Sequence, residues 1–230
     1  IRLAGLRKTL KHNTYLERLH YLVTKVSGKE SIIEQPTVQI ISKAENIEQY
    51  ELAVQNYVRQ GYPNRSLLII TSFEKDDFVK SKVIEHDIIT ATDFDITDIE
   101  ATILKPDFVA FLSPLDYYGR NYLTDLQLGF KYSDTRIVTK SSHYVALDSN
   151  KIKRVEQGSE YKMCIKSGYN NSMIEYSLLN EKILGNYVLD PDSDLLDEEN
   201  RLSIDEFNYC KNYYLHNCAG HLESTICDIE

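Results

Sequence analysis

The sequence predicts an α/β fold in which a mainly parallel sheet is flanked by helices. Short runs rich in Val, Ile and Leu occur at 37–42, 66–72 and 106–112, as expected for strands that are buried on both faces. Stretches with the helical spacing of apolar residues follow the first and the third run. Buried strands that alternate with helices are typical of α/β proteins.

The N-terminal part is expected to be helical. Leucines recur on one face of residues 2–24, opposite lysines and arginines. This basic side is a candidate for contact with an anionic membrane surface, but the favoured interpretation is a helix that packs on this domain or leads in from an upstream one. Residues 28–36 are predicted to be a linker. We therefore expect three parts: residues 1–34, a domain at 35–212, and a tail at 213–230.

The central elements follow from local patterns. A strand at 37–42 leads into a helix at 44–60, whose stripe comprises Ile47, Tyr50, Val54, Tyr57 and Val58. The turn residues GYPN at 61–64 end that helix before the strand at 66–72. A third strand is expected at 82–90.

The fourth strand, at 106–112, opens the second half of the domain. The helix expected at 120–132 would pack through Leu123, Leu126 and Phe130. One further strand is predicted at 135–147. Beyond residue 150 the periodicity weakens.

Composition narrows the class of protein. The 230 residues suit one α/β domain or two small ones. The net charge of −9 argues against a general nucleic-acid binder, which needs a basic face. No apolar run is long enough to span a membrane. Four scattered cysteines favour a reducing compartment. We expect a cytoplasmic protein, with association with a membrane surface as the alternative.

The strand ends are where a ligand is expected. In open α/β sheets, ligands bind beyond the carboxyl ends of the strands. These ends are Ser42 and Lys43 after the first strand, Thr71 and Ser72 after the second, and 113–116 after the fourth.

Several ordered segments resemble a known family. PTVQIIS, a helix and QGYPNRSLLIIT resemble the opening of the family 2 glycosyltransferases, which have the GT-A fold of the nucleotide-diphospho-sugar transferases. PDFVAFLSPLDYYGRNYLTDLQLGFKYSDTRIVTKSSHYV resembles the segment that carries the family's Asp-x-Asp metal motif. The likeness is nearest to a bacterial branch linked to cell-surface and spore-coat glycans. It covers 35–150 well and 150–212 weakly, where IDEFNYC resembles the end of the domain.

The resemblance implies a mechanism. A nucleotide-sugar would lie across the strand ends, and Mn²⁺ or Mg²⁺ on the aspartate motif would neutralise the leaving diphosphate. A carboxylate base would deprotonate the hydroxyl of a glycan acceptor. Other domains or subunits of a glycan-synthesis protein would be its partners.

The aspartate motif is degenerate in this sequence. Aligned on the Tyr-Tyr-Gly that follows, the family's run of aspartates corresponds to Ser113, Pro114, Leu115 and Asp116. Only one acid remains, and alone it would leave a divalent ion mostly bound by water. Asp116 is either a residual metal ligand or an acid that stabilises the turn and caps the following helix. We favour the second interpretation.

Other positions that contact the donor in the family also differ. Ser42, Lys43 and Glu45 stand where the family has a Thr-Tyr-Asn-like turn, and Thr71 and Ser72 stand where it usually has an acid. The segment DITDIEATILKPD has neither the glycine nor the asparagine expected before the fourth strand.

The resemblance places the catalytic base late in the chain. Asp192 and Asp194 are the nearest acids, although a solvated acidic loop is the favoured interpretation of this run. Lys140 and His143 lie on or just past a strand beside the expected cleft. His143 has a substrate role or, as we favour, a structural one.

The C-terminal cysteines and histidines are candidate ligands of a zinc site. Cys210, His216, Cys218, His221 and Cys227 are zinc-ligand types, but their spacing fits no common zinc pattern. We favour a helix without metal there.

Three functions remain open. The favoured one is a catalytically degenerate glycosyltransferase domain, a pseudoenzyme that acts as a binding or assembly module. The second is an active, metal-independent transferase in which Lys43 or Lys140 neutralises the diphosphate. The third is a non-enzymatic module that holds a glycan or a protein in a tyrosine-rich cleft.

Overall fold

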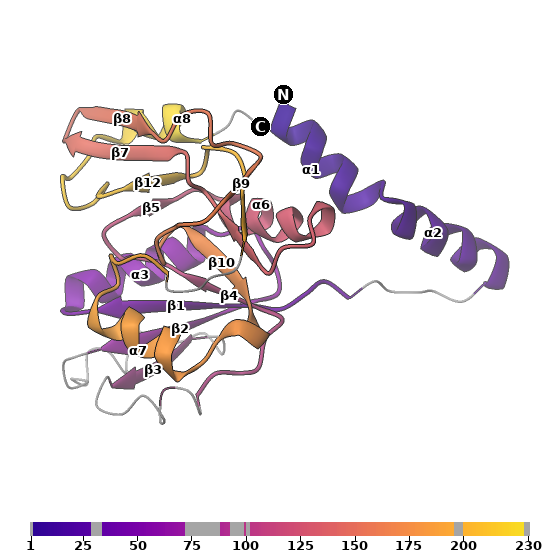
Figure 1. Cartoon of the computed structure of the whole chain (residues 1–230), viewed down its shortest axis with the longest axis horizontal. Coiled ribbons are helices and arrows are strands. Elements are labelled where there is room, and N and C mark those ends of the chain that lie inside the picture. Colours follow the sequence, from indigo (N-terminus) through magenta and orange to yellow (C-terminus); the bar gives the residue numbers. More distant parts are fainter. Residues whose placement is uncertain are drawn as a thin grey trace.

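A computed structural model describes residues 2–28, 34–71, 88–92, 99, 102–195 and 200–227. Two sheets are seen in these residues (Figure 1). The larger has eight strands in the order β3-β2-β1-β4-β10-β6-β11-β9, and the smaller has four in the order β5-β12-β7-β8. The predicted α/β fold is confirmed, with a sheet that is mixed and partly parallel.

Four parallel strands form the first half of the large sheet. They are β1 (Val38–Ala44), β2 (Arg65–Thr71), β3 (Ile88–Thr92) and β4 (Phe108–Phe111). Helix α3 (Ile47–Arg59) connects β1 to β2. Because these strands are parallel, their carboxyl ends meet at one edge of the sheet. The start of the third predicted strand, at 82–87, lies outside the described residues.

The second half of the sheet breaks the parallel pattern. Strand β10 (Ser172–Glu175) runs antiparallel between β4 and β6 (Ile137–Thr139). Strand β11 (Arg201–Ser203) is parallel to β6, and β9 (Lys162–Cys164) pairs antiparallel with β11. These strands are three or four residues long, too short for alternation to predict them.

The small sheet collects strands that are far apart in the sequence. It consists of β5 (Tyr117–Tyr118), β12 (Tyr209–Lys211), β7 (His143–Asp148) and β8 (Lys151–Val155). The single strand predicted at 135–147 is therefore wrong, because β6 and β7 belong to different sheets.

The break between β6 and β7 has a physical cause. The Lys140 side chain is fully buried, and its Nζ lies 2.7 Å from Asp205 Oδ1. The Lys140 N–H donates to Asn171 O. The backbone bond extends the pairing of β6 with β10 by one residue, and the Lys140–Asp205 pair anchors the chain where it leaves the large sheet.

The helix expected at 120–132 is shorter than predicted. Helix α6 (Tyr122–Gly129) is followed by a 3₁₀ turn, η1 (Phe130–Tyr132). Leu123 and Leu126 are buried as expected, and Phe130 stacks on Phe108 with ring centroids 4.4 Å apart. The later helices are η2 (Tyr176–Leu178), α7 (Glu181–Leu189), η3 (Gly220–Leu222) and α8 (Glu223–Ile226).

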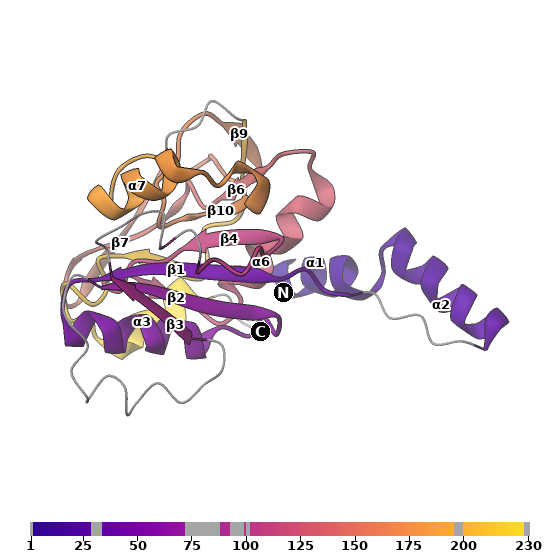
Figure 2. The same ribbon diagram turned by 90° about the horizontal axis from the view of Figure 1, so that it is seen from below.

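The N-terminal helix is in fact two helices, α1 (Arg2–His12) and α2 (Tyr15–Ser27). Thr14 begins α2, since its side chain accepts from the Glu17 N–H and the Glu17 side chain bonds back to Thr14. Gly28 ends α2 with a positive φ of 66°. Figures 1 and 2 both show α2 projecting away from the two sheets.

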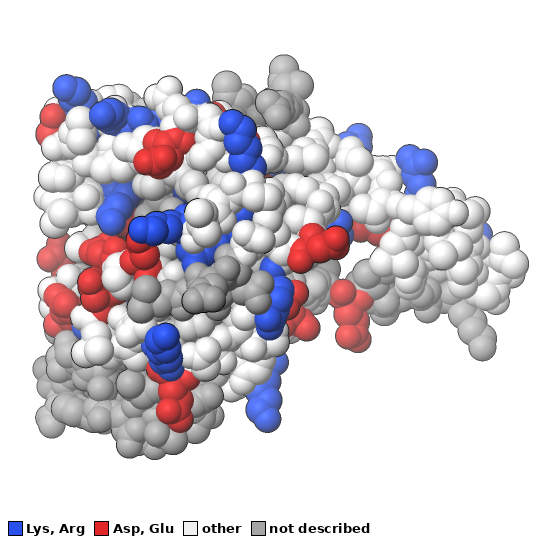
Figure 3. Space-filling view, in the orientation of Figure 1, with Lys and Arg blue, Asp and Glu red and all other residues white. Residues whose placement is uncertain are grey.

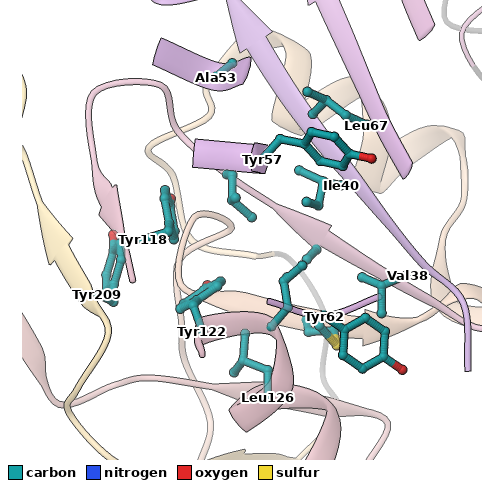
Figure 4. Close-up of a cluster of buried hydrophobic side chains, with 14 of the residues drawn as sticks. Val38, Ile40, Ala53, Tyr57, Tyr62, Leu67, Tyr118, Tyr122, Leu126 and Tyr209 are labelled. Atoms are coloured by element: carbon teal, nitrogen blue, oxygen red, sulfur yellow. The ribbon is translucent and has the colours of Figure 1, made fainter. Parts of the chain in front are cut away.

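Tyrosines fill much of the core on one face of the large sheet. Tyr57, Tyr62, Tyr118, Tyr122 and Tyr209 pack with aliphatic side chains of β1, β2 and α6 (Figure 4). The predicted stripe of α3 is wrong at two positions, because Ile47 and Val58 are exposed. The buried residues of α3 are Tyr50, Ala53, Asn56 and Tyr57.

Residues on both sides of the central domain, in α1 and after residue 212, pack against the rest of the protein. Leu3 and Arg7 of α1 are buried, as are Tyr213, Leu222 and Ile226 near the C-terminus. The division of the chain at residues 34 and 212 stays a prediction. Among the described helices, none is both long and apolar enough to cross a membrane.

Candidate functional site

The candidate site lies at the edge where β1, β2 and β4 end. Here Ser42 does not face a ligand, because its Oγ donates to Leu112 O across 2.7 Å and the residue is buried. Thr71 is also fully buried. Ser72 lies outside the described residues. The hydroxyl groups at the ends of β1 and β2 are thus part of the packed interior.

The turn after β4 is compact and packed. The Asp116 N–H donates to Ser113 O at 3.3 Å, and the Leu115 N–H donates to Ser113 Oγ at 3.3 Å. Pro114 is buried and Leu115 is half-buried. The Leu115 carbonyl accepts from the Tyr214 N–H at 2.9 Å. The C-terminal segment therefore covers the turn that leads from β4 to Asp116.

The Asp116 carboxylate is buried and hydrogen-bonded on both oxygens. Oδ1 accepts from the Asn212 N–H at 2.7 Å, and Oδ2 accepts from the Tyr209 hydroxyl at 2.9 Å. The residue is 1% exposed. Burial raises the pKa of this carboxyl to about 6, although the bonds from Asn212 and Tyr209 act in the opposite direction.

The helix-cap part of our prediction for Asp116 is wrong. Helix α6 is preceded by Asn121, which makes no side-chain capping bond. Asp116 instead fastens the turn after β4 to residues 209–212, which include strand β12.

These residues do not fit a divalent cation. Mg²⁺ and Mn²⁺ prefer several oxygen ligands, usually with more than one carboxylate. Both Asp116 oxygens already accept hydrogen bonds inside the protein. Within the described parts of the chain, no three His, Cys, Asp or Glu side chains are placed to hold a metal ion.

A tyrosine network surrounds Asp116. The Tyr118 hydroxyl accepts from the Ser113 N–H and donates to Asn170 O, both at 2.9 Å. Tyr118 has one hydroxyl hydrogen, so its 3.5 Å approach to Asp116 Oδ2 is not a second donated bond. The Tyr122 hydroxyl lies 3.3 Å from the same Asn170 carbonyl.

The two candidate lysines are already engaged. Lys43 Nζ donates to Val188 O at 2.8 Å, near the C-terminal end of α7, where a positive charge is favourable. Lys140 is fully buried and pairs with Asp205. The structure therefore gives each ammonium group a partner within the protein.

His143 is held by backbone carbonyls. Its Nδ1 lies 3.1 Å from Lys140 O and 2.9 Å from Ser141 O. Since a carbonyl only accepts, Nδ1 carries the proton in the neutral ring. Burial lowers the pKa of this imidazole, and the ring lies 5.1 Å from that of Tyr209.

Of the two candidate bases, Asp192 lies near Asp116. The negative charge of Asp192 raises the pKa of Asp116, and the positive charge of Lys211 lowers the same pKa. Lys211 Nζ is 3.3 Å from Asp192 Oδ1, and both side chains are open to solvent, with 34% and 70% exposed. Asn170 Nδ2 also approaches Asp192 Oδ1 at 3.4 Å.

Asp194 and Glu45 are two further candidate residues, and both are exposed at the surface. Asp194 is exposed and forms an isolated antiparallel bridge with Gly168. Glu45 is exposed, and its backbone N–H donates to Gln49 Oε1 at 2.9 Å, at the start of α3.

Sequence reasoning missed Lys211, Asn170, Tyr118 and Tyr209 at this site. The Tyr-Tyr pair directly after Asp116 was the available signal for Tyr118. The others come from distant segments, and no local pattern marked them.

The C-terminal cysteines have other contacts. Cys210 is buried, Cys218 Sγ approaches Asp148 O at 3.4 Å, and Cys227 Sγ lies 3.4 Å from the Tyr117 hydroxyl. They help to pack the small sheet against α8.

Only solved structures match this chain in the comparisons with known proteins, and they identify its fold. No family model matches the chain, and no curated protein matches it either. Among solved structures, residues 1–349 of S. aureus TarS match with a TM-score of 0.51 at 11% identity. GalNAc-T7 with UDP, GalNAc and Mn²⁺ matches with a TM-score of 0.50 at 10% identity. The fold is that of the GT-A glycosyltransferases.

The matches cover most of this chain and less of the GT-A proteins. They span 76% and 75% of this chain, but only 60% of TarS 1–349 and 43% of GalNAc-T7. The sequence resemblance thus predicted the fold correctly.

Proposed function

We propose that this chain is a GT-A domain of a bacterial surface-glycan or spore-coat biosynthesis protein that lacks metal-dependent sugar transfer. It serves as a binding or assembly module beside other domains or subunits of that protein. The glycan context rests on the sequence resemblance alone.

The observation that carries the proposal is the Asp116 carboxylate. A diphosphate that leaves a sugar needs its charge neutralised, in this fold by a cation on the motif after β4. Asp116, the one acid left there, is buried and accepts bonds from Asn212 and Tyr209. Its neighbours in the turn, Pro114 and Leu115, offer no ligand side chains and pack against the protein.

Titration calorimetry tests the proposal. UDP- and GDP-sugars, each with Mn²⁺, are expected to give no heat beyond dilution. The Asp116→Asn variant should behave identically, since the carboxylate binds no ion in this account. Micromolar binding that requires Mn²⁺ and disappears in this variant would refute the proposal.

A second candidate function is favoured by the Lys211–Asp192 pair. These opposite charges lie 3.3 Å apart, are solvent-exposed, and flank the buried Asp116. In a metal-independent transferase, Lys211 would neutralise the diphosphate as its bond to the sugar carbon breaks. Asp192 would accept the proton of the attacking acceptor hydroxyl.

Turnover in EDTA separates the two functions. The second predicts sugar transfer that Lys211→Ala abolishes and that Lys162→Ala, at an exposed lysine of β9, leaves intact. Lys43→Ala tests whether the lysine on β1 also contributes. Absence of turnover with every donor would leave the binding module as the function.

A further inference from the structure

Helix α2 has one apolar face and one polar face. At 100° per residue, six apolar side chains fall within a stripe about 120° wide. They are Tyr15, Leu16, Leu19, Leu22, Val23 and Val26. The other side of the helix carries Glu17, Arg18, Thr24 and Lys25, together with one apolar residue, Tyr21.

Nothing in the described parts of the chain covers this stripe. The exposed fractions run from 47% at Leu19 to 88% at Tyr15 and Val26, and no residue of α2 is buried. Helix α1 is different, because it buries Leu3 and pairs Arg7 with Asp125. The face of α2 seen in Figure 3 is largely free of charged atoms.

The direction of α2 is fixed at its first turn. Lys131 Nζ lies 2.9 Å from Leu10 O and 3.3 Å from Glu17 Oε1. These contacts join the end of α1 and the start of α2 to η1, so the helix projects from the body with its apolar stripe open to solvent.

The spacing within the stripe is that of a helix-pairing seam. Leu16, Leu19, Val23 and Val26 are separated by three, four and three residues. This is the a–d–a–d spacing of a heptad repeat, whose side chains insert between those of a second helix. Such a seam is complementary to another copy of itself.

The exposed area is what a homodimer needs. Six half to almost fully exposed Leu, Val and Tyr side chains present roughly 600 Å² per copy. A pair of copies would bury roughly 1,200 Å², which reaches the lower end of specific interfaces. The area per copy lies at the upper end of the largest apolar patches that monomers expose.

We propose that α2 is a self-association surface, which pairs with α2 of a second copy of this chain through the stripe from Tyr15 to Val26. This interaction is independent of sugar binding or transfer. Adsorption to an anionic membrane is less favoured, because the polar side of α2 carries Glu17 as well as Arg18 and Lys25.

The chain should therefore self-associate in a concentration-dependent way. The pairing segment has 13 residues, so we expect a reversible monomer–dimer equilibrium in the micromolar range rather than a permanent dimer. Sedimentation equilibrium of the whole chain measures it directly.

Matched glutamine variants locate the surface. Leu19→Gln and Val23→Gln retain the charge of the helix and remove one apolar side chain from the seam in each copy. Each should weaken dimerisation by about a hundredfold, since two buried side chains are lost per dimer. Tyr21→Gln is the control, because Tyr21 is 62% exposed but lies off the stripe, and it should leave the equilibrium unchanged.

Three results would overturn the proposal. The first is a monomer at all concentrations. The second is a dimer that is insensitive to both stripe variants or equally sensitive to Tyr21→Gln. The third is a monomer that floats with anionic phosphatidylserine vesicles and loses this binding in Leu19→Gln, which would assign the stripe to a membrane. Circular dichroism checks that each variant keeps its helix content.

Discussion

Tyr209 donates its hydroxyl hydrogen to Asp116 Oδ2 at 2.9 Å, across 93 residues of sequence. This bond joins strand β12 of the small sheet to the turn that follows β4 of the large sheet. A buried acid thus contributes to the contact between two sheets.

The pH dependence of stability should reveal this buried acid. The pKa of Asp116 rises from an ordinary 3.8 to about 6 in the folded chain. The folded state thus binds a proton more tightly, and the stabilisation this gives is complete below about pH 4 and lost as the pH rises through 6. We expect Asp116→Asn, which cannot ionise, to gain stability relative to the original chain over this interval.

Urea unfolding at pH 4, 5, 6 and 7 measures this difference. Subtracting the two curves removes the contributions of other acids, including Asp125, whose pKa burial also raises to about 6. A difference that is flat from pH 4 to 7 would show that Asp116 is not buried as described.

Gly119 should not tolerate a side chain. A Cβ there would lie 2.5 Å from Asn208 Oδ1, 3.1 Å from Cys227 Sγ and 3.2 Å from Asn208 Cα. Gly119→Ala is expected to cost about 1–3 kcal/mol of unfolding free energy through overpacking. Gly5→Ala in α1 is the control, because a Cβ added there meets no other part of the structure within 4 Å. It should stabilise the chain by up to about 1 kcal/mol.

The ion pair between α1 and α6 should be essential for docking of α1. Arg7 Nε lies 2.6 Å from Asp125 Oδ1, and both side chains are at most 10% exposed. Arg7→Leu leaves Asp125 buried without this partner, and we expect a loss of about 3 kcal/mol at pH 8. The loss should shrink at pH 5, because Asp125 can then take up a proton. Lys8→Leu, at the exposed neighbouring position, should change stability little.

The two lysines considered for the diphosphate should differ in their structural roles. Lys140→Met removes the partner of Asp205 in the interior and should lower thermal stability strongly. Lys43→Met removes one hydrogen bond to Val188 O at a half-buried site and should cost about 1 kcal/mol. Thermal melts of the two variants compare them directly, and equal melting temperatures would contradict this assignment.

Local patterns in the sequence were enough to predict β1, β2 and β4. Each is a continuous apolar run, because both faces of the large sheet are covered. The break between α1 and α2 could also have been predicted from the local sequence, since Thr14 and Glu17 have the spacing of a capping box. The leucine periodicity across residues 2–24 concealed it.

Long-range contacts determine what the sequence could not reveal. The turn between β6 and β7 depends on Asp205, 65 residues from Lys140. The role of Asp116 depends on its hydrogen bonds with Tyr209 and Asn212. The sequence could place Asp116 in the turn after β4, but it could not identify these two distant partners. Similarly, Lys211 at the end of β12 meets Asp192, which follows α7 and lies in a different part of the sequence.

The small sheet also dictates an order of folding. The parallel strands β1, β2 and β4 can pair once residue 111 has been synthesised, whereas β5 gains its partner β12 only at residues 209–211. Loop closure over that separation is slow relative to local pairing. During translation the carboxyl group of Asp116 therefore stays hydrated until Tyr209 and Asn212, which bond to its two oxygens, have left the ribosome.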